Sequence, residues 1–521
     1  MLDAKKVILT LADNTTNTIT DSSRLSTEED YSAAIYSKED LIINGNGTLN
    51  VNAGYRNGIK STDDCIIVSG TLNITSTEDG IIGKDLCGIV AGDININAGS
   101  DGIKSTYDTD TIKGNVIIEG GNITIKASND GIQAENILVI NDGTINIKTN
   151  NGAADTTQTH IDNMDMGRGG FGFNNNKTTT TTDDTSESRK GIKAGNMLII
   201  NDGDITIDSD DDSVHCNSVI YIYGGTINAA TGDDGVHADD LLTVNGGTIN
   251  ITQCYEGLEA DDIVINDGDI SVVSSDDGIN SSDGSITING GNLLINASGD
   301  GLDANGSIII NGGYIVVLGP TSDGDTAIDY DDSCTINGGT VMAFGSSGML
   351  EIPKGASNGA CIVTAFTSVS GGSKYTLSDS NGNEILSYTP SKAYAAAIVY
   401  SDKITTGNTY NITAGSTTLS IEVTSDVTSN VSSGFGGAGG MNKPGNGGSG
   451  MPNNGSSDNG MNGNSNGSMP DMSGNGAPDM NGNSSGDMPS MGGNSSNNSG
   501  NMPNMNNGSS NVNAPQMNNR M

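Results

Sequence analysis

Tryptophan is absent from this chain of 521 residues, phenylalanine occurs five times, and aromatic residues make up only 4% of the sequence. A conventional packed α/β enzyme core uses more of these large side chains. Lysine and arginine total 22 against 63 acidic residues, which gives a formal net charge of −41. Nucleic-acid binding needs clustered basic residues, and the sequence has no such cluster. The same shortage argues against binding to an anionic membrane surface.

Long hydrophobic runs are also missing. A transmembrane helix needs about 18 consecutive apolar residues, and no segment reaches that length, so membrane insertion is not expected. The apolar run from Val7 to Ala12 is too short for the core of a signal peptide. We therefore expect either a cytoplasmic protein or a chain whose leader has been removed. Six cysteines in this length are too few for a disulfide scaffold.

The sequence contains instead an internal repeat with a period of about 22 residues. Each unit contains a segment of the type D-G-I-x-A. The units are aligned on the second position of this segment, which is glycine in most of them. The aligned residues are Ala34, Gly58, Gly80, Gly102, Gly131, Gly191, Ser213, Gly235, Gly257, Gly278, Gly301 and Ala327. A branched aliphatic residue follows each of them, in the order Ile35, Ile59, Ile81, Ile103, Ile132, Ile192, Val214, Val236, Leu258, Ile279, Leu302 and Ile328.

Alternating apolar and polar residues, separated by Gly, Asp and Asn, predict three short strands per unit. No segment shows helical periodicity. The sequence therefore predicts an all-β fold, a right-handed parallel β-helix of about 12 coils. Equivalent residues in successive coils of such a fold lie about 4.8 Å apart. The aliphatic column is expected to fill the interior. An asparagine column should form a ladder of amides, from Asn44, Asn141, Asn201, Asn245, Asn266, Asn289, Asn311 and Asn337.

Departures from the repeat indicate the domain organisation. The β-helix is predicted over residues 1–350, with an insertion loop at 150–189, where one interval between aligned residues is much longer than the others. Residues 351–430 have strand signals without the repeat and are predicted to form a β cap over the end of the helix. Residues 431–521 consist mainly of Met, Asn, Gly, Ser and Pro, and we expect this tail to be disordered.

Acidic residues precede the aligned position in eight units, at Asp79, Asp101, Asp130, Asp212, Asp234, Glu256, Asp277 and Asp300. An Asp-Gly pair is common in turns, where the carboxylate accepts local N–H bonds. Stacked carboxylates about 5 Å apart repel by about 0.8 kcal/mol in water and about 3 kcal/mol at an effective dielectric constant of 20. The column therefore needs backbone donors or bound cations.

Acidic residues also gather on positions predicted to point outward, and the densest patch includes Asp239, Asp240, Asp261 and Asp262. Carboxylate oxygens are the ligands that Ca²⁺ prefers. We therefore predict Ca²⁺ as a cofactor, and a merely solvated acidic face is the alternative. The predicted ligands are Asp233, Asp234, Asp239, Asp240, Glu256, Glu259, Asp261, Asp262, Asp277, Asp300 and Asp303.

The position two residues after the aligned one is basic in the earlier coils and acidic in the later ones. Its basic members are predicted to contact carboxylates of a substrate, and the alternative is that they offset neighbouring acids. These predicted substrate-binding residues are Lys60, Lys104, Lys193, His215 and His237. The three histidines, which include His160, lack the spacing along the chain that is typical of a zinc site.

Cys65 and Cys87 occupy equivalent positions in adjacent units. Their Cα atoms are expected to lie about 5 Å apart, within the range of a disulfide. A disulfide and a pair of free thiols in the core are equally compatible with this spacing.

The chain resembles a bacterial family of secreted carbohydrate-binding domain-containing proteins with a polysaccharide-lyase-like β-helix. The phrases that carry the resemblance are SDGIKSTYDTDTIKG (100–114), TGDDGVHADDLLTVNGGTINIT (231–252), YEGLEADDIVIN (255–266), SSDDGIN (274–280), GPTSDGDTAIDYDD (319–332) and FGSSGM (344–349). The match covers roughly residues 1–415. The resemblance implies calcium binding, a location outside the cell or on its surface, and attachment to plant cell-wall polysaccharides, either acidic ones such as polygalacturonate or cellulose.

Three functions are compatible with these features. The first is non-catalytic, Ca²⁺-dependent binding of pectin-like polysaccharide, as in an adhesin, and we favour it. The second is a pectate-lyase-like enzyme, which commonly uses arginine as its base. All five arginines fall outside the repeat strands, although Lys104 or Lys193 could replace one. The third is a structural surface or spore-coat protein.

Overall fold

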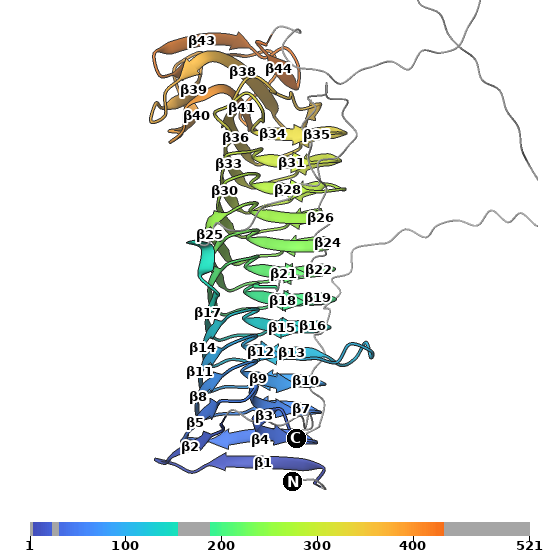
Figure 1. Ribbon diagram of the computed structural model, residues 1–521. Coiled ribbons are helices and arrows are strands. Elements are labelled where there is room, and N and C mark those ends of the chain that lie inside the picture. The colour runs from blue at the N-terminus through green and yellow to red at the C-terminus, as the bar shows by residue number, and fades with distance from the viewer. Residues whose placement is uncertain (1–3, 23–30, 155–187, 432–521) are drawn as a thin grey trace, which may run out of the picture. The chain divides into compact units, whose positions relative to one another are not determined.

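The chain winds into a stack of coils in which short strands build three faces (Figure 1). The computed structural model describes residues 4–22, 31–154 and 188–431. Most of the predicted insertion loop and nearly all of the predicted tail, as well as His160, lie outside the described residues. Within them, one 3-10 turn (Gly152–Ala154) accompanies 44 strands. No helix in these ranges is long and apolar enough to span a membrane.

Face I begins directly after the aligned residue of each coil, and neighbouring strands are parallel. Its strands are β3 (Ala33–Ser37), β6 (Asn57–Ser61), β9 (Ile81–Gly83), β12 (Ile103–Lys104), β15 (Ile132–Ala134), β18 (Ile192–Ala194), β21 (Val214–Cys216), β28 (Ile279–Ser281), β31 (Leu302–Ala304) and β34 (Ile328–Tyr330). Face II follows, with β1 (Lys6–Leu11), β4 (Asp40–Gly45), β7 (Asp64–Ile67), β10 (Leu86–Ile89), β13 (Asn115–Ile118), β16 (Ile137–Ile140), β19 (Met197–Ile200), β22 (Val219–Ile222), β29 (Ile286–Ile288), β32 (Ser307–Ile310), β35 (Ser333–Ile336) and β37 (Gly355–Ala356). In two middle coils a single strand runs through faces I and II, as β24 (Val236–Val244) and β26 (Leu258–Ile265).

Face III completes each coil. Its parallel strands are β2 (Thr16–Thr20), β5 (Thr48–Ala53), β8 (Thr71–Ser76), β11 (Asp93–Ala98), β14 (Asn122–Ala127), β17 (Thr144–Thr149), β20 (Asp204–Ser209), β23 (Thr226–Thr231), β25 (Thr248–Cys254), β27 (Asp269–Ser274), β30 (Asn292–Ala297), β33 (Tyr314–Leu318) and β36 (Thr340–Gly345). The stack thus has about 13 turns and confirms the predicted parallel β-helix. The sequence predicted about 12, because β1 and β2 form a first coil that has no aligned residue of its own.

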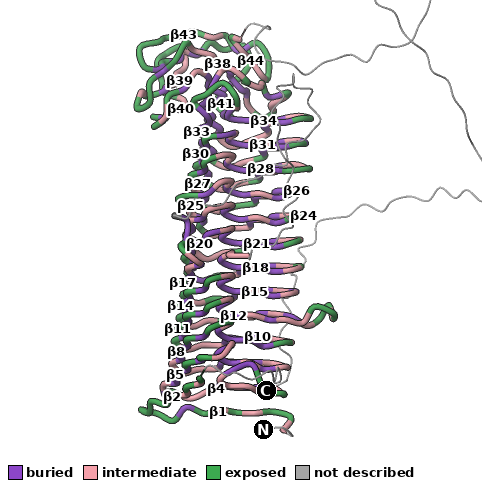
Figure 2. Tube along the Cα trace, viewed as in Figure 1, coloured by how far each residue is buried: buried purple, intermediate pink, exposed green. Residues whose placement is uncertain are grey.

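The interior consists of columns of aliphatic side chains, one from each coil. Figure 2 shows that buried residues recur in every part of the stack. From Ile59 to Ile328, every member of the predicted aliphatic column is fully buried. On face III, alternate residues point inward, so that Ile94, Ile123 and Ile145 stack in register on successive strands. This period-2 burial is the pattern that the sequence showed. The strands therefore pair and bury their apolar residues as predicted.

The aligned glycines are required because a face III side chain lies against them. A Cβ atom on Gly131 would lie 2.4 Å from Cγ2 of Ile147 and 2.5 Å from the carbonyl oxygen of Gly191. The other aligned glycines from Gly58 to Gly301 face isoleucine or valine at similar distances. Where the aligned residue is Ser213 or Ala327, the equivalent face III residue is alanine, Ala229 or Ala343. At these two positions a larger aligned residue is accompanied by a smaller partner, whereas the equivalent face III residue in the coil of Ala34 is Val51.

The asparagine column forms the predicted ladder in two stretches. Side-chain amides connect Asn141 to Asn201, and then Asn245, Asn266, Asn289, Asn311 and Asn337 in succession, at 2.7–3.0 Å. Tyr223 takes the asparagine position between the two stretches. Asn44 is outside the ladder, because the equivalent residue of the next coil is Val68 and has no amide.

The C-terminal strands change direction and cover the edge of face III. Strand β41 (Tyr394–Ser401) pairs antiparallel with β36 and with β38 (Ala360–Val369), and β44 (Val427–Ser429) pairs with β38. An antiparallel sheet follows, formed by β39 (Tyr375–Asp379), β40 (Glu384–Tyr388), β42 (Thr409–Ala414) and β43 (Thr417–Glu422). These strands share a second hydrophobic cluster. A free sheet edge would otherwise be open to pairing with other chains.

Cys65 and Cys87 are register partners on β7 and β10 and are fully buried. Both are free thiols, as are the other four cysteines. Of the two alternatives that the spacing left open, the structure has the stack of thiols in the core. Burial raises the pKa of Cys87 to about 12, so that this thiol stays protonated and unreactive.

Candidate binding face

The acidic column lies at the corner between face III and face I, and most of its members form a ladder with the backbone. One carboxylate oxygen of these residues accepts the N–H of the equivalent residue in the next coil. Lys190 interrupts the column after Asp130, and among the described residues no such bond joins Glu256 and Asp277. Asp101 N–H donates to Asp79 Oδ1 at 3.1 Å, and Asp130 N–H donates to Asp101 Oδ1 at 3.0 Å. Asp234 accepts from Glu256, and Asp277 accepts from Asp300, in the same way. Backbone donors therefore satisfy one oxygen of these carboxylates and leave the second for other partners.

In the earlier coils, lysines of face I neutralise this second oxygen. Lys104 lies 2.6 Å from Asp101 Oδ2, and Lys193 lies 4.0 Å from Asp130 Oδ2. These two predicted substrate ligands thus offset neighbouring acids. Lys60 has no ion pair among the described residues, and burial lowers its pKa. Of the three predicted lysines, Lys60 is the one whose ammonium is uncommitted.

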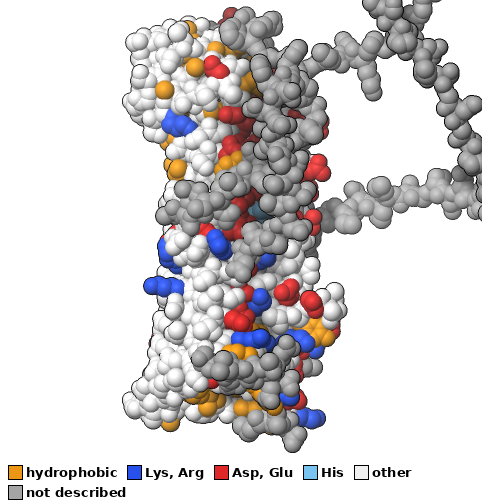
Figure 3. All heavy atoms as spheres, in the orientation of Figure 1, with side chains coloured by type: hydrophobic (Ala, Val, Ile, Leu, Met, Phe, Trp, Pro, Cys, Tyr) orange, Lys and Arg blue, Asp and Glu red, His pale blue; other side chains and the backbone are white. Residues whose placement is uncertain are grey.

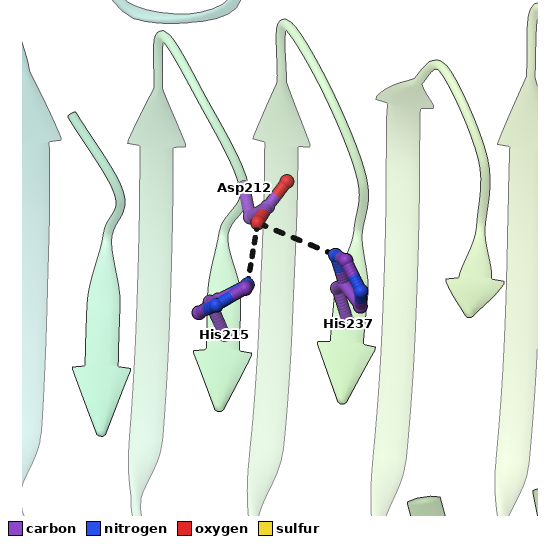
Figure 4. A group of neighbouring side chains, drawn as sticks. All are labelled: Asp212, His215 and His237. Atoms are coloured by element: carbon purple, nitrogen blue, oxygen red, sulfur yellow. Dashed lines mark ion pairs between the residues drawn. The ribbon is translucent and has the colours of Figure 1, made fainter. Parts of the chain in front are cut away.

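In the middle coils, His215 and His237 flank Asp212 (Figure 4), and Lys190 contacts the same carboxylate. Lys190 Nζ lies 2.6 Å from Asp212 Oδ2, and Nδ1 of His215 and of His237 lie 2.8 and 3.7 Å from the same oxygen. Burial alone would raise the pKa of Asp212, but Lys190 and the two histidines hold it well below its usual range. For His237 the effect of burial is outweighed by Asp212 and Glu259, which raise its pKa to about 9.

In the later coils, the carboxylates have no basic partner. Asp277, Asp300 and Asp303 each offer an oxygen, and these oxygens lie within 4.8 Å of one another. No lysine, arginine or histidine of the described ranges forms an ion pair with them. Burial, together with the neighbouring acids, raises the pKa of Asp277 to about 9, of Asp300 to about 8 and of Asp303 to about 7. Glu256 has a pKa of about 8 for the same reasons, and its Oε2 accepts from Asn280.

The two ends of the acidic ladder therefore differ in charge, because basic side chains accompany it in the earlier coils and not in the later ones. In Figure 3 the basic side chains in view lie mostly over the lower, N-terminal coils, and the charged side chains over the upper coils are mostly acidic. Three half-buried carboxylates without a counter-charge are stable only if they take up protons or a cation. They remain partly open to solvent, so that a cation can reach them. A set of carboxylate oxygens alone suits Ca²⁺.

The structure does not bring together the outward patch that the sequence indicated. Asp239 and Asp240, and likewise Asp261 and Asp262, lie where faces I and II join within β24 and β26. Asp240 accepts from Ser218 at 2.7 Å, Asp261 from Ser282 and Asp262 from Ser285. In the part of the chain that the structure describes, none of these four shares a three-ligand group within 4.8 Å.

Of the remaining predicted metal ligands, three fall into other groups, and Glu256 belongs to none of the groups among the described residues. Asp234 and Glu259 lie with His237, and Asp233 lies with Asp211 and Asp212. A further group, formed by Asp40, Asp63 and Asp64, was missed by the sequence reasoning. Its members come from neighbouring coils of face II, and only the strand register brings them together.

A small aromatic surface is also present. The rings of Tyr221 and Tyr223 stack with their centroids 6.4 Å apart and their planes at 24°, and Tyr223 is exposed. Tyr221 lies on β22 and Tyr223 directly follows this strand, and both side chains point outward from the coil. Stacked aromatic rings of this kind are suited to the apolar face of a neutral sugar.

The sequence matches known carbohydrate-binding domain-containing proteins. Residues 1–235 and 233–419 match the family model described as carbohydrate-binding domain-containing protein. A carbohydrate-binding domain-containing protein from Acetivibrio thermocellus is 39% identical over 75 residues, which are 14% of this chain and 26% of that protein. The chain thus matches about a quarter of the length of this curated relative. No solved structure matches. Because the family model covers most of the sequence, the chain belongs to the carbohydrate-binding domain-containing protein family.

Proposed function

We propose that this protein binds acidic cell-wall polysaccharide, such as polygalacturonate, without catalysis and with Ca²⁺ as a bridge. Its place of action would be outside the cell or on its surface, where such polymers occur. The observation that carries the proposal is the group of Asp277, Asp300 and Asp303, which has no basic partner among the described residues. Family membership supports carbohydrate binding as such.

Electrostatics explains why a cation is needed. A chain with a formal net charge of −41 repels a polyanion. A divalent ion held by Asp277, Asp300 and Asp303 would reverse the local sign of the charge and retain open positions for carboxylates of the ligand. Lys60 can add a direct contact to a carboxylate. An extended polymer lying along the coils could contact both Lys60 and an ion held by the group of Asp277, Asp300 and Asp303.

The absence of catalysis is part of the proposal and rests on the arginines. Of the five, the structure describes Arg56 and Arg189. Arg56 pairs with Glu78 at 3.8 Å, and Arg189 pairs with the buried Asp210 at 2.7 Å. Neither is free to act as the base of a lyase. Of the two lysines considered as bases, Lys104 pairs with Asp101 at 2.6 Å and Lys193 lies 4.0 Å from Asp130.

Binding to insoluble polysaccharide tests the proposal. The full chain should be retained on a polygalacturonate gel in Ca²⁺ and released by EDTA, with no increase in the ultraviolet absorbance that unsaturated lyase products give. Retention that is unaffected by EDTA would contradict the bridging role of Ca²⁺, and such absorbance would establish a lyase. Cellulose serves as a parallel matrix. Retention on cellulose alone would assign binding to a neutral surface such as Tyr221 and Tyr223, and retention on neither would leave a structural role.

A further inference from the structure

Two histidines and an aspartate meet at the centre of the binding face. His215 on β21 and His237 on β24 are register partners in adjacent coils, and their rings lie 4.9 Å apart. Asp212 lies in the turn that precedes β21. Figure 4 shows all three side chains directed toward one another. Each of the three residues offers one ligand atom, and these three atoms all lie within 4.8 Å of one another.

The hydrogen bonding of His215 leaves its Nδ1 as an electron-pair donor. Nε2 lies 2.9 Å from Asn217 Oδ1, and an amide oxygen can only accept, so that Nε2 carries the proton. The residue is 8% exposed, and its Nδ1 is buried without a hydrogen-bond partner. Asp212 Oδ2 is only 2.8 Å from this nitrogen, but the geometry is not that of a hydrogen bond. Two electron-pair donors at this distance need a proton or a metal cation between them.

The remaining distances fit one ion. His237 Nδ1 lies 3.7 Å from Asp212 Oδ2, 3.5 Å from Asp234 Oδ2 and 3.4 Å from Glu259 Oε2. Metal bonds to nitrogen and oxygen of about 2.0–2.2 Å place neighbouring ligand atoms about 2.8–3.6 Å apart. The spacing of the donor atoms is therefore close to that of a coordination shell.

We propose that His215, His237 and Asp212 bind a divalent first-row transition-metal ion of the Zn²⁺ type. Oxygens of Asp234 and Glu259 are near enough to complete its coordination. Imidazole nitrogen is a ligand for Zn²⁺, Cu²⁺, Ni²⁺ and Fe²⁺, whereas Ca²⁺ is held by oxygen alone. This site is thus distinct in chemistry from the group of Asp277, Asp300 and Asp303. The inference goes beyond the proposed polysaccharide binding and does not depend on it.

Lys190 is compatible with this ion. It lies 2.6 Å from Asp212 Oδ2, and a carboxylate oxygen has two lone pairs, so that it can accept from Lys190 and also bind a metal. The three carboxylates of Asp212, Asp234 and Glu259 outweigh the single ammonium of Lys190 and leave the site negative. Imidazole binds a metal only in its neutral form, so that binding of the ion releases the proton of any protonated histidine in the cluster.

Asn217 has a positioning role in this arrangement. By accepting from Nε2 it fixes the tautomer of His215 and directs Nδ1 to the ion. Partners of this kind commonly change metal affinity by about 10- to 100-fold when they are removed. Replacing Asn217 by alanine is therefore expected to weaken binding within that range, although Asn217 contributes no metal ligand.

Titration of the full chain, free of any affinity tag, with Co²⁺ and Zn²⁺ tests the proposal. The chain should carry His160→Gln, so that His215 and His237 are its only histidines. We expect one equivalent of Co²⁺ with visible ligand-field absorption and its displacement by Zn²⁺. The double variant His215→Asn and His237→Asn should lower the affinity at least about 10-fold. A matched variant, Asp267→Asn and Asp269→Asn, removes two exposed charges and should keep the affinity.

Several outcomes would overturn the proposal. One is that Co²⁺ and Zn²⁺ do not bind at micromolar concentration, which would show that a proton alone satisfies the cluster. Another is that the double histidine variant, folded by circular dichroism and thermal melting, retains the bound equivalent. A third is that Asn217→Ala leaves both the affinity and the absorption unchanged. Neither Ca²⁺ nor polysaccharide is present in this titration, so its result is separate from the test of polysaccharide binding.

Discussion

Replacing Asp300 and Asp303 by asparagine is expected to weaken Ca²⁺-dependent binding to polygalacturonate by about 100-fold, the upper end of what altered metal sites commonly lose. The variant removes two of the three carboxylates that face one another without a counter-charge. It also removes negative charge from the protein, which by general electrostatics would strengthen binding to a polyanion. The expected direction is therefore opposite to that of an unspecific charge effect. Affinity on immobilised polygalacturonate at a fixed Ca²⁺ concentration measures it.

Folding of this variant should be preserved, because asparagine resembles the protonated carboxyl group that the raised pKa values favour. Asparagine Oδ1 can also accept the N–H of Thr326, as Asp300 does. The control is Asp267→Asn with Asp269→Asn, which removes two exposed acids elsewhere and should bind as well as the unchanged protein. Equal losses in the two variants, or none in either, would argue against a Ca²⁺ site at Asp300 and Asp303.

Replacing Gly131 by serine should lower the stability by about 1–3 kcal/mol, because its Cβ has no space beside Ile147. Ile147→Ala alone should cost about 2–5 kcal/mol through the cavity that it leaves. The two substitutions together should cost clearly less than the sum, with a coupling of at least about 1 kcal/mol. The chain already contains the combined arrangement, as Ser213 with Ala229.

Ile147→Ala is expected to offset only part of the stability that Gly131→Ser loses, because a Cβ at residue 131 also approaches the backbone of the next coil. On Gly131 this Cβ would lie 2.5 Å from the carbonyl oxygen of Gly191. Thermal unfolding of the four proteins measures the cycle. Gly324→Ser is the control, since a Cβ there meets nothing within 4 Å. Additive losses would mean that the two residues do not compete for space.

The architecture could be predicted from the sequence because each column repeats one physical requirement in every coil. The aliphatic residue after the aligned position can be predicted to be buried from the sequence of its own coil, without knowing which residues it contacts. Ile59 and Leu302 are examples. The reason for the glycine column could not be found in the same way. It depends on a face III residue later in the coil, and only the register shows that Ala229 accompanies Ser213.

The candidate sites were only partly predictable. Asp277, Asp300 and Asp303 were among the predicted Ca²⁺ ligands, but the densest patch was predicted at Asp239 and Asp261, which stand in consecutive acidic pairs. Successive residues of a strand point in opposite directions, and the β24–β26 pairing shifts register between Ala238 and Leu241. Adjacent acids in the sequence therefore do not converge on one point in space.

The histidine cluster was missed because zinc ligands were sought by their spacing along the chain. His215 and His237 are separated by one coil, and Asp212 belongs to the preceding turn. The usable signal was already in the alignment, since both histidines stand two residues after the aligned position. Stacking at about 4.8 Å per coil brings such residues into contact.

Thermal unfolding with and without Ca²⁺ at two pH values tests the central claim most directly. In EDTA, Glu256, Asp277 and Asp300 keep their protons in the folded protein up to pH values of about 8–9, whereas in the unfolded chain they ionise near pH 4. The unfolded state then binds fewer protons, and stability falls as the pH rises from about 5 to 8. Ca²⁺ replaces these protons and should raise the midpoint more at pH 8 than at pH 5, and polygalacturonate should raise it further only when Ca²⁺ is present. A midpoint that does not respond to Ca²⁺ at pH 8 would contradict the account and leave the acidic ladder as turn chemistry alone.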